Sequence, residues 1–140
     1  MSATWEIQKA LYDALNGNSS FMTLIGSKLY DEPPTDTDYP YVVISETTEI
    51  SDNRLDKLGF EDTVTFLIYT KPAGLGFYTA KKILEAMNTV LNVHRFTLTN
   101  YNMLMCKIDN VRTIRDDDKR IISARYRVWA HSDTAHSVWK

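Results

Sequence analysis

Hydrophobic positions that recur at intervals of three and four predict two main helices. One apolar stripe runs from Ile7 to Leu15 and stops at Gly17, a spacing that places its members on one helical face. A longer stripe runs from Phe77 to Leu91, and its opposite face is polar. The residues that we expect to carry this second stripe are Phe77, Ala80, Leu84, Met87 and Leu91, and it is widened by Ile83, Ala86 and Val90. A shorter apolar run over 20–25 predicts one further helical turn.

Alternating apolar and polar positions predict four main strands. The strands expected are 41–50, 60–70, 102–115 and 120–131. The last is the clearest, because small or apolar residues alternate there with polar, Arg and Trp residues. A bulge is expected near Asp109, a hairpin turn at 116–119, and a brief extended piece at 28–30.

The order of these elements predicts the fold class. The main elements follow one another as α-β-β-α-β-β, and the strands come in adjacent pairs with short or polar connections. We therefore expect an α+β fold in which an antiparallel sheet of about four main strands carries two helices on one face. A chain of 140 residues suits one domain. We assign residues 1–131 to it and residues 132–140 to a C-terminal extension.

Charge is distributed unevenly along a chain whose net charge is only −2. Residues 31–62 hold ten acids against two bases, whereas residues 107–140 hold eight bases against five acids. Solvated loops would explain this pattern. The alternative is a pair of complementary surfaces on one protomer that meet between neighbouring copies.

The sequence offers little support for catalysis or for a metal. Cys106 lies in a predicted strand among apolar residues, so we expect a buried side chain and no nucleophile. His131 and His136, with one nearby acid, fall short of a metal ligand set. The aspartates 116–118 fit a turn better than a cation site. We expect no cofactor, no membrane span and no secretory leader.

The last hairpin and the preceding acidic stretch contain the candidate contact residues. Arg and Trp on the outward side of a strand are typical of interface cores, while the three turn aspartates argue against a track for nucleic-acid phosphates. We expect the polar loop 51–59 to be ordered by partners. The candidate residues are Glu46, Glu49, Asp52, Arg54, Lys57, Tyr69, Arg112, Arg125, Arg127 and Trp129.

Several stretches together resemble one known protein family. They are KALYDAL, GSKLYDEPPTDTDYPYVVISETTE, TVTFLIYTKPAG, AKKILEAMNTVLN and VRTIRDDDKRIISARYRVWA. The chain resembles the tail-completion proteins of long-tailed phages and prophages over about residues 7–130. These proteins are also called tail terminators or head–tail joining proteins. The charged loop 51–59 and the extension 132–140 depart from the usual pattern.

The resemblance implies a non-enzymatic virion protein of the tail or neck, assembled in the host cytoplasm. It implies a homo-oligomeric ring, usually a hexamer, that caps the tail tube and meets a head connector. DNA would pass through the lumen. Two alternatives remain open at the level of the sequence. One is a small ferredoxin-like domain that binds a ligand or catalyses a reaction, and the other is a head-side adaptor protein.

Overall fold

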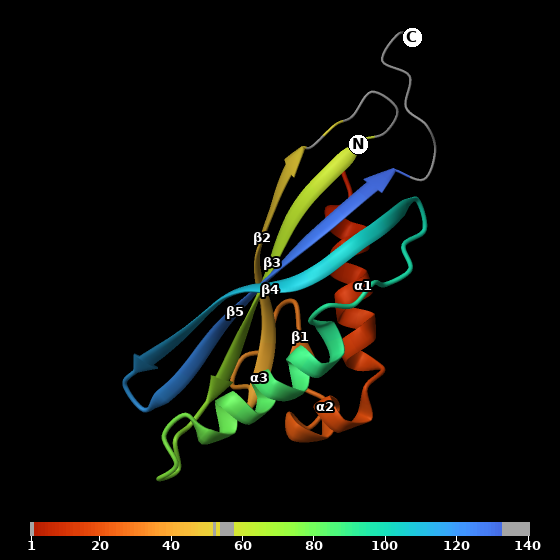
Figure 1. Ribbon diagram of the computed structural model, residues 1–140. Helices are drawn as coiled ribbons and strands as arrows, with labels where there is room; N and C mark the ends of the chain where they lie inside the picture. The colour runs from red at the N-terminus through yellow and green to blue at the C-terminus, as the bar shows by residue number, and fades with distance from the viewer. Residues whose placement is uncertain (1, 52, 54–57, 133–140) are drawn as a thin grey trace, which may run out of the picture.

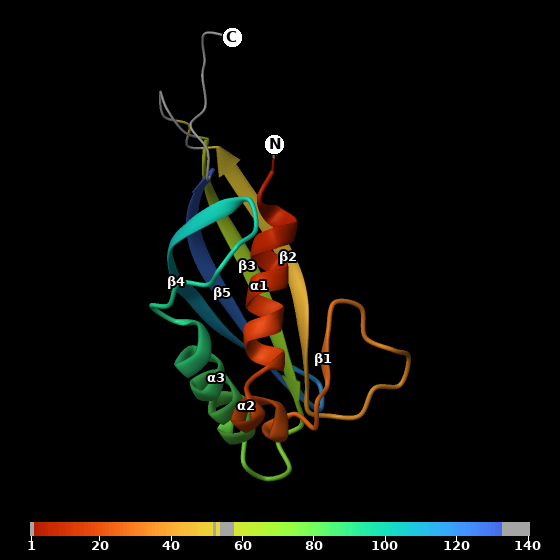
Figure 2. The same cartoon turned by 90° about the vertical axis from the view of Figure 1, so that its right-hand side faces the viewer.

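The computed structural model describes residues 2–51, 53 and 58–132. Within this part of the chain, three helices lie on one face of a five-stranded sheet and leave the other face uncovered (Figures 1 and 2). The elements in chain order are α1 (Thr4–Asn16), α2 (Ser19–Leu24), β1 (Leu29–Tyr30), β2 (Tyr41–Ser51), β3 (Gly59–Thr70), α3 (Tyr78–Leu91), β4 (Tyr101–Asp116) and β5 (Lys119–Ser132).

The sheet confirms the predicted α+β class and corrects its details. Its strand order is β1-β2-β3-β5-β4, and the four long strands are antiparallel to their neighbours. The brief extended piece is a fifth strand, β1, which runs parallel to β2. The sheet is therefore mixed, because a two-residue strand adds to the outer side of Val42 and Val43. The helical turn predicted after α1 is a third helix, α2.

The pairing register defines rows that cross the whole sheet. One row contains Leu29, Val42, Ile68, Ile122 and Thr113, in order from β1 to β4. The register shifts in β4 between Ile108 and Asn110, which confirms the predicted bulge. Two further shifts lie in β4 between Met103 and Met105 and in β2 between Ile44 and Thr47. These rows fix the height of each residue along the strands.

The N-terminus of α1 is held by a side chain from the sheet. The N-cap residue of α1 is Ala3, which has no capping side chain of its own. Instead, Glu49 Oε2 accepts hydrogen bonds from the Ala3 amide at 3.0 Å and from the Thr4 hydroxyl at 3.2 Å. A carboxylate here satisfies a free amide and complements the positive end of the helix.

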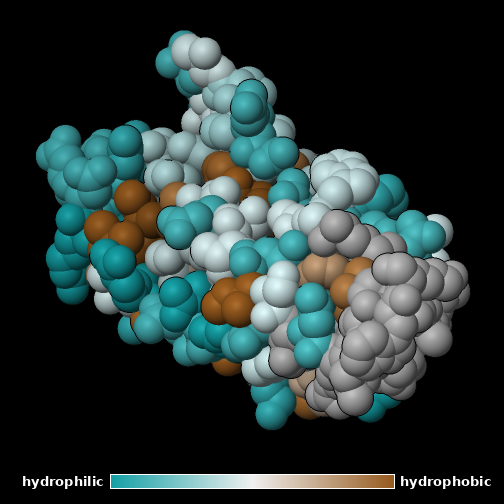
Figure 3. All heavy atoms as spheres, turned by 90° about the horizontal axis from the view of Figure 1, so that it is seen from above, coloured by the Kyte–Doolittle hydropathy of each residue, from teal (hydrophilic) through white to brown (hydrophobic). Residues whose placement is uncertain are grey.

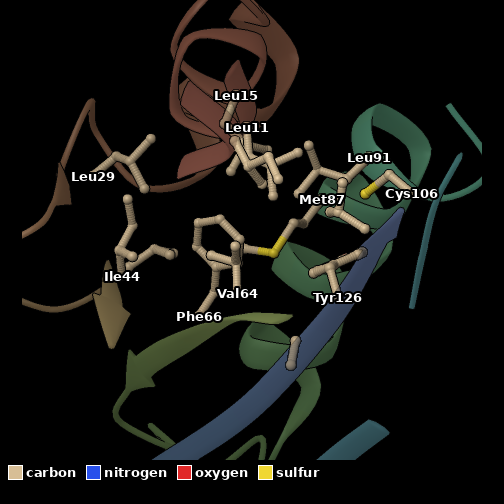
Figure 4. Close-up of a cluster of buried hydrophobic side chains, with 14 of the residues drawn as sticks. Leu11, Leu15, Leu29, Ile44, Val64, Phe66, Met87, Leu91, Cys106 and Tyr126 are labelled. Atoms are coloured by element: carbon tan, nitrogen blue, oxygen red, sulfur yellow. The ribbon is translucent and has the colours of Figure 1, made fainter. Parts of the chain in front are cut away.

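The core lies between the helices and the sheet (Figure 4). Phe66, Met87 and Tyr126 are fully buried, and Figure 4 shows Met87 pointing toward the ring of Phe66. The predicted stripe of α3 is buried at Ala80, Met87 and Leu91, but two of its positions, Phe77 and Leu84, are only partly buried. Ile83 is fully buried, whereas Leu84 is only partly buried at the edge of the core. The helix is therefore turned slightly toward Ile83.

Candidate subunit-contact surfaces

The uncovered face of the sheet carries a polar band across its middle. Threonine, serine and charged side chains meet there around a hollow of about 310 Å³. The lining residues are Glu46, Thr48, Thr63, Thr65, Asn110, Arg112, Ser123 and Arg125. An antiparallel sheet that packs helices on one face commonly presents such a polar face to solvent or to a partner.

Two of the candidate arginines share one carboxylate on this face. Asp109 Oδ2 lies 2.7 Å from Arg125 Nη2 and 3.1 Å from Arg127 Nη2. Arg127 Nη1 also reaches Glu61 Oε1 at 2.5 Å. The hydrogen bond from Arg127, with a second from Arg125, lowers the pKa of Asp109 below its ordinary value. These arginines therefore already have partners within the chain.

The candidate acids do not gather in one place, and only Glu46 shares the polar hollow with Arg112 and Arg125 among the described residues. Glu46 lines the polar hollow on the uncovered face, whereas Glu49 lies on the helix-covered side and binds the start of α1. The bulge after Ile44 decides this arrangement, because an extra residue reverses the alternation of faces beyond it. Asp52, Arg54 and Lys57 lie outside the described residues.

The two candidate aromatic anchors lie at opposite ends of the sheet. Tyr69 pairs with Ile121, eight residues along β5 from Trp129, which corresponds to about 27 Å. Tyr69 stacks on Tyr41, with ring centroids 4.9 Å apart. Trp129 is half-buried opposite Glu61. Trp129 and Tyr69 therefore belong to two separate patches. Figure 3 likewise shows small hydrophobic patches separated by polar groups on the face that it presents.

Asp62 is a functional candidate that the sequence reading missed. It is 1% exposed, lies directly across from Glu49 and approaches the Thr4 hydroxyl at 3.4 Å. Burial away from water, together with Glu49, raises the pKa of Asp62 to about 8. The signal was present in the sequence, since Asp62 shares the alternation of Phe60 and Val64, which are both buried.

Cys106 is buried as predicted and is expected to resist alkylation in the folded protein. Its side chain is fully buried, and burial raises the pKa of the thiol to about 12. Because the thiolate is the reactive species, the native chain should stay unmodified by iodoacetamide under conditions that fully modify the denatured chain. Intact mass before and after denaturation measures this. Rapid labelling of the native protein would show that β4 opens readily.

The described residues contain no group of three or more His, Cys, Asp or Glu side chains that could hold a metal ion. Of the two histidines considered as metal ligands, only His131 lies in the described part of the chain. His131 Nδ1 lies 2.9 Å from the Ser132 carbonyl oxygen, and His136 lies outside the described residues. None of the helices in the described part of the chain has the length and apolar character that a membrane crossing requires.

The described residues form a small α+β domain with one sheet face left uncovered. The model of the family described as "Tail completion protein gp17" matches residues 9–131. The chain therefore belongs to this family of phage tail completion proteins.

One solved structure with the same fold is a chain of a virion particle. It is a chain of the structure titled "Virion of native gene transfer agent (GTA) particle". Its TM-score is 0.85 at 20% sequence identity, over 94% of this chain and 98% of that chain. At this identity the likeness establishes the fold. A search of curated proteins found no match.

Proposed function

We propose that this chain is a non-enzymatic tail terminator, which forms a ring that caps the tail tube and joins it to the head connector. The family match over residues 9–131 carries the proposal. The shared fold of a chain from a virion particle supports a place in the particle, and the family's description points to the tail. Assembly would take place in the host cytoplasm.

A ring of six copies is the assembly that we propose. Each copy would contact the next through two different patches, as heterologous contacts in closed rings require. One opening of the ring would meet the tail tube protein and the other the head connector, and DNA would pass through the lumen as cargo. The proposal involves no membrane. Residues 132–140 stay a predicted extension, of which Ser132 ends β5 and residues 133–140 lie outside the described residues.

A structural role agrees with the chemistry of the described residues. The thiol of Cys106 is buried, which makes it a poor nucleophile. On the uncovered face, Arg125 and Arg127 pair with Asp109, and Arg127 also pairs with Glu61. These groups hold strands β4 and β5 together, and they do not form the nucleophile and base that catalysis needs.

Negative-stain microscopy of particles made with and without this chain tests the proposal. Without it, we expect tails of irregular length that lack heads, and supply of the wild-type chain from a plasmid should restore joined particles. Normal, head-bound tails in its absence would contradict the proposal. Detached tails of normal length with normal ends would instead favour the head-side adaptor.

A further inference from the structure

One edge of the sheet is free over half of its length. The first part of β4, up to Cys106, is covered by the segment that follows α3, because His94 pairs with Cys106 and Thr97 with Asn102. From Asp109 to Asp116, the outer side of β4 has no strand partner among the described residues. An unpaired strand edge is a ready site for another chain.

The opposite edge carries an acidic loop. Residues 31–40 connect β1 to β2, and Figure 2 shows this loop standing out beyond β1. Within the described residues, none of its carboxylates makes an ion pair, although Lys28 donates to the Asp38 carbonyl oxygen at 3.0 Å. Its acids are Asp31, Glu32, Asp36 and Asp38, and it contains no base.

The acidic loop and the free edge lie at the same height along the strands. The chain leaves β1 at Tyr30, whose row ends at Arg112 on β4. It re-enters the sheet at Tyr41, whose row ends at Ile114. A ring without rise, with its axis along the strands, brings these two edges of neighbouring copies face to face.

The free edge carries two arginines that make no ion pair with an acid of the described residues. Arg112 is exposed and makes no ion pair with the described residues, and Arg115 lies over the Phe77 ring with Cζ 4.9 Å from its centroid. No acid lies between Asn110 and Arg115 on β4. Among the turn aspartates, Asp118 is paired with Lys71 at 3.5 Å.

We propose that the acidic loop 31–40 of one copy binds the free β4 edge of the next, around Arg112 and Arg115. This contact rests on the proposed ring and specifies where its subunits meet. Arg112 projects on the uncovered face and Arg115 on the helix side, so the loop would contact both sides of the strand edge.

Five strands spaced about 4.8 Å apart make each sheet about 24 Å wide. Six sheets then enclose a circle about 45 Å across at the backbone, which leaves room for duplex DNA.

The proposal changes the acids assigned to the contact. The sequence pattern alone favoured Glu46, Glu49 and Asp52. Glu49 binds α1 within its own chain, and Glu46 faces the polar hollow. Asp52 lies outside the described residues. Arg125 and Arg127 are likewise bound by Asp109. The loop acids and the β4 edge are the oppositely charged groups that lie at one height on opposite edges.

Paired cysteines test the contact without altering its charges. Thr35 and Thr113 are exposed, so Thr35→Cys and Thr113→Cys are introduced into a Cys106→Ser background. A short bismaleimide is added to particles that contain the variant and to the concentrated purified protein. The double variant should give a ladder of crosslinked species that ends in a closed ring. A mixture of the two single variants should give dimers only, because each copy then has one reactive site.

The controls separate this contact from the proposed function. Ser51→Cys with Thr113→Cys should not crosslink, because Ser51 lies nine residues, or about 30 Å, along β2 from the row of Thr113. Capped, joined tails that contain the double variant without crosslinks would overturn the contact and leave the proposed function intact. Crosslinks formed equally by the control pair would also overturn the contact.

Charge reversal provides a second readout that does not depend on cysteine. Arg112→Glu with Arg115→Glu should lower the fraction of capped tails at least tenfold. Addition of Glu32→Lys and Asp38→Lys to the same chain should restore part of that loss. Lys81→Glu with Lys82→Glu makes the same change of charge on the exposed side of α3 and should have little effect. Normal assembly of the first variant would contradict the contact.

Discussion

Replacement of Met87 by alanine is expected to lower the free energy of unfolding by about 2–5 kcal/mol. Met87 is fully buried between α3 and the sheet and points toward Phe66, so its removal leaves a cavity in the centre of the core (Figure 4). Denaturant unfolding followed by circular dichroism measures the loss.

Leu84→Ala is the matched control on the same helix. Leu84 lies one position beyond Ile83 and is only partly buried, so its truncation should cost less than half as much. An equal or larger loss from Leu84→Ala would mean that α3 is turned toward Leu84, as the hydrophobic spacing alone predicted.

Replacement of Asp62 by asparagine is expected to stabilise the protein more at pH 8 than at pH 5. The unfolded chain loses the proton of Asp62 around pH 3.8, whereas burial keeps it bound in the folded chain up to about pH 8. Between these values unfolding releases a proton, so the free energy of unfolding falls as the pH rises. Asp62→Asn removes this decline, and its advantage should grow by about 2–4 kcal/mol between pH 5 and pH 8.

Unfolding of both proteins by urea at the two pH values measures the difference. Glu49→Gln is the companion variant, since it keeps an oxygen acceptor for the Ala3 amide and removes the neighbouring negative charge. It should lower the pKa of Asp62 and flatten the pH dependence in part. An equal effect of Asp62→Asn at pH 5 and pH 8 would contradict the account of this buried carboxyl.

Local patterns predicted the long elements because each of these buries one face. The alternation along β5 and the helical stripe of α3 place apolar residues against the same core. The fold class and the bulge near Asp109 follow from such patterns. The two residues of β1 are too few to show a period, and their parallel pairing with β2 depends on a chain reversal through the loop 31–40.

The parts that sequence reasoning missed depend on contacts between distant residues. Glu49 binds the Ala3 amide, 46 residues away along the chain, and no local spacing indicates this. The charge pattern correctly separated an acidic from a basic region, but it could not show that Asp109 binds both Arg125 and Arg127. It also could not show which acids share a height with the β4 edge, because that depends on the register of five strands.

A symmetry-averaged cryo-EM map of the neck of a particle that contains this chain tests the central claim most directly. We predict six copies of the fold arranged around the DNA channel at the head-proximal end of the tail tube, with each uncovered sheet face at a similar radius. The assignment as a tail terminator would be contradicted if density for the chain lay on the head side of the connector. It would also be contradicted if the end of the tube showed no density for the chain.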